Sequence, residues 1–378
     1  QVVSLLKTAK VYIDFGHHPG KDRIPREASY LNCCVITNRK GSTFYQNDLP
    51  IKEEFKFNQG QHLTLKTTIN GEEVRRSYSL CSSPLEDKWQ VAVKKINGGL
   101  FSTFINSELK KGDTLEIMPP SGHFFKPVDT TKAKNYIVFA AGSGITPILS
   151  IIKTHLAAEP NATFKLFYLN RTVKSIIFKE QIEQLKNLYF NRLEIFHFLT
   201  KEHRPVELFN GRFTKEKLQV MAEKLFDPKE IDECFICGPE DMIFLLRDEL
   251  TALGLDKEKI HYELFVTGIS EEDKKRAVTI AEKKVDGTEV TIIDGGKEFH
   301  FIMEADYDNI LDGAIAAGAD LPFACKGGVC GTCRCKIVEG TAEMKINYAL
   351  DESEVEKQLT LSCQAVPTSK KLVVDFGV

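Results

Sequence analysis

The sequence lacks any apolar run long enough to cross a bilayer. Its apolar stretches, such as those at residues 136–141 and 148–152, are far shorter than the roughly 20 residues of a spanning helix. It also lacks an excess of one charge, since 50 Lys and Arg stand against 53 Asp and Glu. Such a balance provides no field that would attract nucleic acid or anionic lipid. No basic segment followed by an apolar core marks a secretion signal, so we expect a cytoplasmic protein without membrane or nucleic-acid partners.

The length and the charge distribution predict several domains. A chain of 378 residues exceeds one compact core, and 42% hydrophobic residues exclude a fibrous or wholly disordered protein. Residues 278–378 hold 10 basic and 17 acidic side chains, whereas residues 1–277 hold 40 and 36. The polar stretch 268–276 lies at this change. We therefore predict a linker at residues 266–277 and a separate C-terminal domain at 278–378.

The first part of the chain has the pattern of short antiparallel strands. Apolar and polar residues alternate at 62–67, 75–80, 90–94 and 114–118, and Asn70-Gly71 is a hairpin turn signal. This pattern predicts an antiparallel β-barrel over residues 1–130. Residues 1–50 are atypical and give only one possible strand, at 9–13.

The middle of the chain alternates strands with helices. Apolar strand-like runs at 136–140, 164–169, 193–199 and 233–237 are separated by helical patterns, among them 147–156, 178–188 and 240–253. This order predicts a doubly wound parallel sheet over residues 131–265. The last hundred residues show a hairpin signal at Asp286-Gly287 and a helical run at 309–317.

Five of the ten cysteines lie near the C-terminus. Cys325, Cys330, Cys333 and Cys363 have the spacing of plant-type [2Fe–2S] ligands. Glycines 327, 328 and 331 permit positive φ angles and bring N–H groups toward the sulfur atoms. A zinc site is the alternative, although zinc sites more often use paired C-x2-C motifs and need no such glycines. We expect Cys335 to point elsewhere, and expect buried thiols at Cys33, Cys34, Cys81, Cys234 and Cys237.

Residues 278–378 resemble plant-type ferredoxins beyond the cysteines themselves. The flanks Leu321-Pro322-Phe323-Ala324 and Leu361-Ser362 match that family. The resemblance implies a β-grasp domain that holds one [2Fe–2S] cluster.

The segment Arg76-Ser77-Tyr78-Ser79 resembles the flavin signature of the ferredoxin–NADP reductase superfamily. The resemblance implies that FAD is bound, with Arg76 on its pyrophosphate, Tyr78 stacked on the isoalloxazine and Ser79 near the reactive nitrogen. It further assigns to the flavin site Ser77, Val93, Lys94, Gly98, Gly99, Leu100 and Ser102, the glycine-rich part of which precedes a helix start.

The motif Gly142-Ser143-Gly144-Ile145-Thr146-Pro147 lies between a strand and a helix, a place where a helix N-terminus can face a dinucleotide. Together with Cys237-Gly238-Pro239, it resembles the nicotinamide motifs of the same superfamily. The resemblance implies an NADPH or NADH site made by Gly142, Gly144, Thr146, Pro147, Asn170, Arg171, Cys237, Gly238, Pro239 and Phe265. Arg171 favours NADPH because it could hold a 2′-phosphate. A Glu and an aromatic at Glu263 and Phe265 would approach the flavin edge, although Phe265 is nearly as well explained as an apolar anchor.

The domain order resembles the multidomain reductases that feed bacterial oxygenases. The resemblance implies that electrons pass from NAD(P)H through FAD to the cluster and then to an oxygenase component of a multisubunit complex, which is a di-iron protein in the closest relatives. It also implies that the catalytic residues are Tyr78, Ser79, Thr146, Cys237 and Phe265. A reductase for another aromatic-ring hydroxylase or a haem monooxygenase would carry the same motifs. A redox sensor or zinc module on a non-catalytic flavoprotein is the non-enzymatic alternative.

Overall fold

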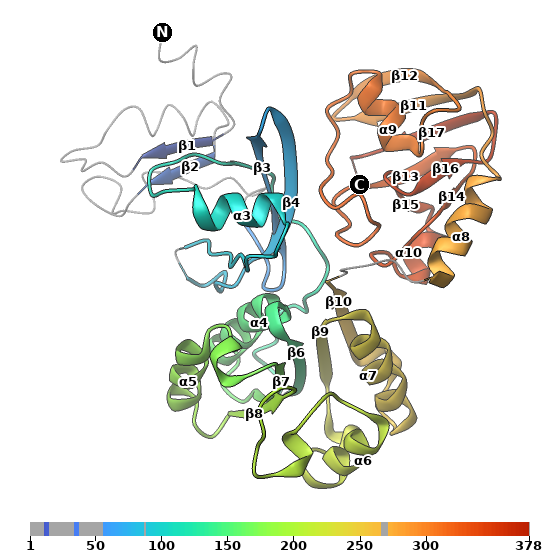
Figure 1. Cartoon of the computed structure of the whole chain (residues 1–378). Helices are drawn as coiled ribbons and strands as arrows, with labels where there is room; N and C mark the ends of the chain where they lie inside the picture. Colours follow the sequence, from blue (N-terminus) through green and yellow to red (C-terminus); the bar gives the residue numbers. More distant parts are fainter. Residues whose placement is uncertain (1–10, 15–33, 38–55, 87, 266–270, 378) are drawn as a thin grey trace.

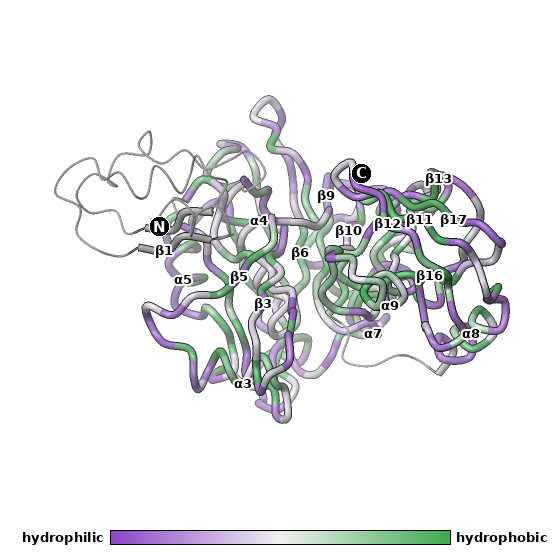
Figure 2. Tube along the Cα trace, turned by 90° about the horizontal axis from the view of Figure 1, so that it is seen from above, coloured by the Kyte–Doolittle hydropathy of each residue, from purple (hydrophilic) through white to green (hydrophobic). Residues whose placement is uncertain are grey.

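The computed structural model describes residues 11–14, 34–37, 56–86, 88–265 and 271–377. Figure 1 shows three groups of elements: the hairpin of β3 (His62–Ile69) and β4 (Glu72–Ser79) with helix α3 (Leu100–Ser107), a parallel sheet flanked by helices, and a C-terminal group of strands. Apolar residues gather along the strands of these groups, whereas many outer loops are polar (Figure 2). In the part of the chain that the structure describes, no helix is both long and apolar enough to cross a membrane.

An antiparallel sheet of order β4-β3-β5 forms the predicted flavin domain. Its strands are β3 (His62–Ile69), β4 (Glu72–Ser79) and β5 (Glu116–Ile117), and helix α3 spans Leu100–Ser107. Alternation along β3 buries Leu63 and Leu65 with Phe101 of α3. The antiparallel arrangement is thus confirmed. The strand expected at 90–94 is reduced to one bridge between Leu80 and Val91, because the chain then leaves the sheet with exposed side chains.

The front of the expected barrel lies largely outside the described residues. Strands β1 (Val11–Asp14) and β2 (Cys34–Thr37) pair in parallel. The first of them overlaps the strand predicted at 9–13. The expectation of a buried thiol at Cys33 lies outside the described residues and that at Cys34 stays untested, whereas Cys81, Cys234 and Cys237 are buried as expected.

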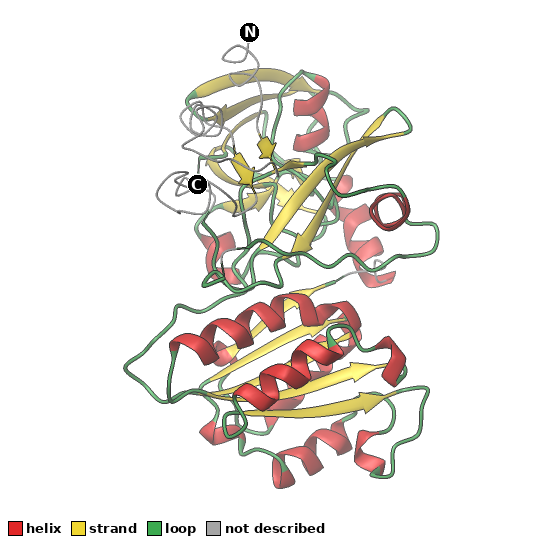
Figure 3. Ribbon diagram, turned by 90° about the vertical axis from the view of Figure 1, so that its left-hand side faces the viewer, coloured by secondary structure: helices red, strands yellow, loops and turns green. Residues whose placement is uncertain are grey.

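The central domain is a parallel sheet of order β10-β9-β6-β7-β8 with helices on both faces (Figure 3). Its strands are β6 (Asn135–Ala141), β7 (Thr163–Asn170), β8 (Leu193–Leu199), β9 (Glu233–Gly238) and β10 (Ile260–Leu264). Its helices are α4 (Ile145–Ala158), α5 (Lys179–Leu188), α6 (Lys215–Lys224) and α7 (Glu240–Ala252). One apolar cluster joins α4 and α5 to the sheet and a second joins α6 and α7, which confirms the doubly wound fold.

The C-terminal domain is a mixed sheet of order β12-β11-β17-β13-β15 with a small second sheet, β14-β16. The strands are β11 (Thr288–Asp294), β12 (Lys297–Met303), β13 (Arg334–Glu339), β14 (Ala342–Met344), β15 (Leu359–Leu361), β16 (Ala365–Pro367) and β17 (Lys371–Asp375). Helix α9 (Ile310–Ala316) packs on the sheet, as a β-grasp fold requires, and α10 spans Glu352–Glu356. The β11–β12 hairpin turns at Gly295-Gly296 rather than at Asp286-Gly287, which lies in the turn before β11.

Residues 271–277 of the predicted linker are helical, and the domain boundary placed there stays a prediction. Helix α8 spans Glu271–Ala281, while residues 266–270 lie outside the described residues. The helix is fixed near both ends: Tyr348 donates a hydrogen bond to Asp273, and Ile280 is buried. Glu and Lys are good helix formers, so a polar stretch with such anchors can be helical. Polarity alone therefore does not indicate a linker.

Candidate functional site

Four thiols meet around the loop between α9 and β13. Cys325 and Cys330 are hydrogen-bonded to each other, and Cys333 is hydrogen-bonded to Cys363, which follows β15. The bond from Cys330, aided by backbone N–H groups, lowers the pKa of Cys325 to about 5. The bond from Cys333 likewise lowers the pKa of Cys363. One sulfur of each pair thus favours the thiolate, the form that binds metals.

The loop backbone points N–H groups at sulfur, as predicted. The N–H of Gly327 donates to Cys325 Sγ at 3.3 Å. The φ angle is positive at Gly328, Gly331 and Lys326, but not at Gly327, which corrects the expectation for that residue. The Lys326 side chain is held by Asp312, with 2.8 Å between Nζ and Oδ1, and this contact helps to offset the strain of a left-handed non-glycine residue.

The donor set fits a two-iron core. Among the described residues, no three His, Cys, Asp or Glu side chains are placed to share a single metal ion. Two pairs of thiols instead suit two irons with two cysteine ligands each, rather than one tetrahedral zinc. Cys335 belongs to neither pair and is fully buried in the core of the domain, which confirms that it points elsewhere.

Strand β4 presents the flavin signature. Arg76 is exposed, and Tyr78, two residues along on the same face, packs its ring 5.9 Å from that of Phe101. Helix α3 starts immediately after Gly98 and Gly99, and a helix N-terminus without acidic residues suits an anion. The structure therefore brings Arg76 and Tyr78 to one face of the β3–β4 hairpin, whereas Ser77 and Ser79 alternate to the other face.

Ser102 lies within the loop rather than facing outward. It is buried; its hydroxyl accepts from the N–H of Ile96 at 3.2 Å and donates to the carbonyl of Gly99 at 3.3 Å. Its direct contribution is to shape the loop. The carbonyl of Val93 is similarly engaged, because it accepts from Asn106 Nδ2 at 3.2 Å.

A cavity of about 400 Å³ opens at the carboxyl ends of β6, β7 and β9. This edge is where ligands bind in open α/β sheets. Asn170, which is 6% exposed, lines the cavity, and its Nδ2 has no hydrogen-bond partner among the described residues. A buried unpaired amide in a cavity wall suits a ligand that brings an acceptor. The residues predicted for the nucleotide that line the cavity are Gly142, Asn170, Arg171, Gly238, Pro239 and Phe265, and they are joined by Lys94, which was predicted for the flavin.

Four predicted residues lie behind this wall instead: Gly144, Thr146, Pro147 and Cys237 are buried and do not line the cavity. The Thr146 hydroxyl donates to the carbonyl of Ser143 at 3.0 Å, so it holds the turn before α4. Burial raises the pKa of the Cys237 thiol well above its usual value. These residues set the shape of the wall.

Glu263 and Phe265 link the sheet to the flavin strand. Ser79 Oγ donates to Glu263 Oε2 at 3.2 Å, which joins β4 to β10. Burial raises the pKa of the Glu263 carboxyl to about 8, only partly opposed by the Ser79 bond. At neutral pH this raised pKa favours the protonated form of the carboxyl beside Ser79. Phe265 bonds through its N–H to the carbonyl of Gly238 at 3.3 Å and lines the cavity.

Sequence reasoning missed other residues of the cavity. Arg212, Thr200 and Ser175 also line it. Thr200 directly follows strand β8, so its place at a carboxyl end was a usable signal. Arg212 lies in the loop before α6, and only the folded chain brings it to Asn170 and Arg171.

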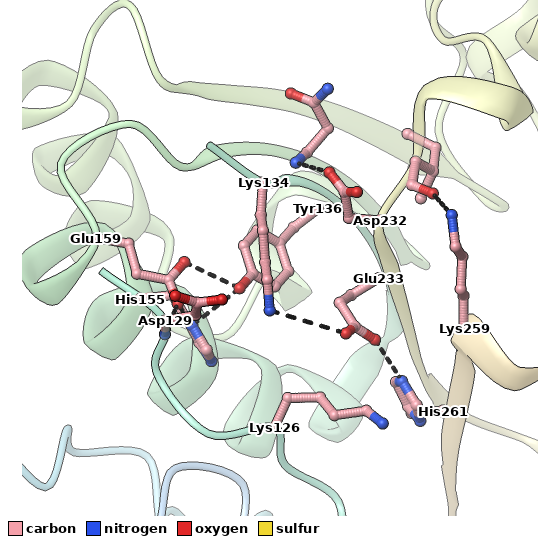
Figure 4. Close-up of polar contacts among 12 residues, drawn as sticks. Lys126, Asp129, Lys134, Tyr136, His155, Glu159, Asp232, Glu233, Lys259 and His261 are labelled. Carbon is pink, nitrogen blue, oxygen red and sulfur yellow. Dashed lines mark hydrogen bonds and ion pairs between the residues drawn. The ribbon is translucent and has the colours of Figure 1, made fainter. Parts of the chain in front are cut away.

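A second polar cluster lies at the opposite, amino edge of the parallel sheet (Figure 4). Glu159, fully buried, accepts from Tyr136 Oη at 2.9 Å and is 2.9 Å from His155 Nδ1. Glu233 Oε2 lies 2.7 Å from His261 Nε2. Since these groups satisfy one another away from the cavity, the cluster stabilises the domain.

Comparison with known proteins agrees with this arrangement. Three family models match: an oxidoreductase FAD-binding domain at residues 40–125, an oxidoreductase NAD-binding domain at 138–248 and a 2Fe-2S iron-sulfur cluster binding domain at 292–368. The chain is 42% identical over 327 residues to one subunit of the 1,2-phenylacetyl-CoA epoxidase of Escherichia coli K12, covering 86% of this chain and 90% of that one. The chain belongs to the iron–sulfur flavoprotein reductases of oxygenase systems.

Two further relatives extend the comparison. The reductase is 32% identical to the ferredoxin reductase component of 3-ketosteroid-9-alpha-monooxygenase from Rhodococcus rhodochrous, over 86% of this chain and 90% of that one. The solved structure of phthalate dioxygenase reductase matches with a TM-score of 0.50 and 26% identity, covering 85% of this chain and 88% of that one. The fold, the FAD, nicotinamide and [2Fe–2S] cofactors and electron transfer from FAD to the cluster, all expected from the sequence, are confirmed.

Proposed function

We propose that this reductase supplies electrons from NADPH to a di-iron oxygenase of the phenylacetyl-CoA epoxidase type. The observation that carries the proposal is the 42% identity to the epoxidase subunit over nearly the whole of both chains. A reductase for another oxygenase remains the second candidate, because the ketosteroid relative is also similar over 86% of the chain.

We assign the cluster to Cys325, Cys330, Cys333 and Cys363. The two hydrogen-bonded pairs support this assignment, because each pair can serve one iron. When bound, a [2Fe–2S] cluster takes up one electron at a time. The loop contributes N–H donors, such as that of Gly327, which stabilise added negative charge on sulfur.

We assign FAD to the side of the β3–β4 hairpin that carries Arg76 and Tyr78. The fork of Arg76 suits a pyrophosphate, and the N-terminus of α3 after Gly98 and Gly99 adds backbone N–H groups. FAD supplies hydride acceptance and one-electron release when bound. The carboxyl of Glu263, with its pKa of about 8, can hold a proton 3.2 Å from Ser79.

We assign the cavity of about 400 Å³ to the pyridine nucleotide. Asn170 offers an unpaired amide, and Arg171 offers charge that suits a 2′-phosphate, whereas Arg212 in the same wall is paired with Asp241 at 2.7 Å. Phe265 lines the same cavity and directly follows β10, the strand that Ser79 joins to the flavin signature. These residues support NADPH over NADH as the donor.

Anaerobic titration with NADPH and, separately, NADH tests the electron path. We expect NADPH to bleach the flavin absorbance and then the cluster absorbance, with NADH slower. Bleaching of the flavin alone would contradict the cluster assignment, and no response to either nucleotide would contradict the reductase function.

Reconstitution tests the acceptor. The reduced protein is mixed with a di-iron epoxidase component or with a Rieske-type oxygenase component, and re-oxidation of the cluster is followed. We expect faster re-oxidation by the di-iron component. Faster re-oxidation by the Rieske-type component would favour the second candidate.

A further inference from the structure

Arg75 lies on the opposite face of β4 from Arg76 and Tyr78. Strand alternation gives the hairpin a second, polar face made by His62, Thr64, Arg75 and Ser77, in which Thr64 Oγ1 and Ser77 Oγ are 3.2 Å apart. This face is not open to water, since Arg75 is only 8% exposed and His62 only 4%. The ferredoxin domain covers it.

The guanidinium of Arg75 bonds mainly to the ferredoxin domain. Nη1 donates to the carbonyl of Leu321 at 3.1 Å, and Nη2 donates to Asp320 Oδ1 at 3.2 Å. The same guanidinium lies 4.2 Å from the centre of the Phe323 ring. Within its own domain, Nε is oriented by Glu73 at 2.7 Å. Such a planar fork, both stacked and hydrogen-bonded, fixes a partner more firmly than a point charge would.

These partners lead directly into the cluster loop. Asp320, Leu321 and Phe323 occupy the five residues before Cys325, so the position of this segment sets the position of the first cysteine. The far end of the loop is held as well. Thr332, between Cys330 and Cys333, places its hydroxyl 3.4 Å from Thr64 Oγ1 and 3.4 Å from His62 Nε2.

A third contact lies beyond the loop, where Arg334 Nη1 donates to His123 Nε2 at 2.6 Å. The interface is polar and imperfectly packed, because a cavity of about 140 Å³ remains beside Arg75, Lys66 and Pro322. Interfaces of this kind are weak and separable. One buried arginine can therefore determine much of their geometry.

We propose that Arg75 is a positioning residue that docks the cluster loop against the flavin strand. The paired arginines of β4 then have separate roles: Arg76 faces the flavin, and Arg75 orders the electron acceptor on the other side of the same strand. The consequence for electron transfer rests on the proposed flavin and cluster sites, whereas the docking contact itself does not.

The test compares Arg75→Ala with Arg247→Ala. Arg247 is a matched control, because it stacks on Phe244 at 4.8 Å and pairs with Asp248 within a single helix of the nicotinamide domain. Hydrogen exchange of residues 319–325 reports docking, and stopped-flow absorbance reports flavin reduction by NADPH and the later cluster reduction. Phe323→Leu provides a second variant if Arg75→Ala fails to fold, and Arg75→Lys tests rescue.

We expect Arg75→Ala to speed exchange at 319–325 and to slow cluster reduction about tenfold, with flavin reduction unchanged. Arg247→Ala should leave all three unchanged, and Arg75→Lys should recover only part of the rate. Wild-type exchange and wild-type cluster reduction in both Arg75→Ala and Phe323→Leu would overturn the proposal. If the wild-type protein itself fails to reduce its cluster, the proposed function fails, while the exchange comparison still decides the docking.

Discussion

Gly144 and Cys237 approach so closely that a side chain at position 144 would overlap the carbonyl of Cys237. The contact joins the turn before α4 to the end of β9. It therefore shapes the wall of the cavity proposed for the nucleotide from two separate βα connections, which neither motif shows on its own.

Gly144→Ala should separate these two connections. The added methyl meets backbone atoms, which cannot rotate away, so we expect a loss of about 1–3 kcal/mol in the free energy of unfolding and weaker NADPH binding. Urea unfolding and equilibrium titration measure both. Ala157→Ser, an exposed change on the same helix, is the control, and wild-type stability in Gly144→Ala would contradict the steric argument.

Glu159→Ala should destabilise the protein without changing the nucleotide site. The carboxylate accepts from Tyr136 Oη and from the N–H of Asp129 at 2.8 Å, and its removal leaves buried donors unpaired. We expect a loss of roughly 3 kcal/mol, against about 1 kcal/mol for Tyr136→Phe. Urea unfolding gives these values. A large change in the Kd for NADPH would show that this amino-edge cluster is coupled to the cavity.

The raised pKa of Glu263 predicts a pH dependence of stability. Between about pH 4.5 and 8 the folded protein keeps a proton on this carboxyl that the unfolded chain releases, so stability falls as pH rises through this window. Glu263→Gln should flatten that fall, as seen by Tm at pH 5 and pH 8. Glu258→Gln, an exposed change, should not alter it. An unchanged slope in Glu263→Gln would contradict the assignment.

Cys330→Ser should affect the cluster, whereas Cys335→Ala should affect only the stability of the domain. We expect Cys330→Ser to lose the visible absorbance and the iron of the cluster, because one of the four thiolates is gone. Cys335→Ala should keep the cluster and lose about 1 kcal/mol of stability, since a buried sulfur in the core is removed. Iron and sulfide analysis with absorbance spectra decides between them, and cluster loss in Cys335→Ala would make that residue a ligand.

Electron delivery to the oxygenase should slow at high ionic strength. The domain from residue 278 onward carries 10 basic and 17 acidic side chains, and the cluster adds negative charge. We expect a decrease of about tenfold between low and high salt in the rate with the oxygenase. Reduction of a small neutral acceptor serves as the control. Equal salt dependence for both acceptors would show that charge on this domain does not steer its association with the oxygenase.

The parallel sheet could be predicted because its strands are continuous apolar runs, buried on both faces. Strand β6 packs Ile137 and Phe139 against one helix layer and Tyr136 and Val138 against the other. A strand that is apolar on both faces is typical of a parallel sheet covered by helices on both sides. Helix α8 could not be predicted, because its anchors, Tyr348 and the surroundings of Ile280, come from distant parts of the chain.

Some features of the candidate site could likewise be predicted from local sequence, whereas others depend on contacts made only in the fold. Cysteine spacing is a local property and predicted the thiols that pair in the fold. Strand alternation places Arg75 and Arg76 on opposite faces, but it does not say what covers the polar face. The positive φ of Lys326, which occurs together with a contact to Asp312, also could not be predicted from the sequence. Nor could the unpaired amide of Asn170, because it depends on the residues that surround it in the fold.

Because the two faces of β4 make different contacts, the number of residues in this strand matters more for those contacts than the identity of most of its side chains. A substitution at Arg75 or Arg76 damages one surface at a time. Insertion or deletion of one residue between Val74 and Tyr78 would instead exchange the two faces and remove the flavin and docking contacts together. Variants of this reductase should therefore tolerate changes of residue in β4 far better than changes in its length.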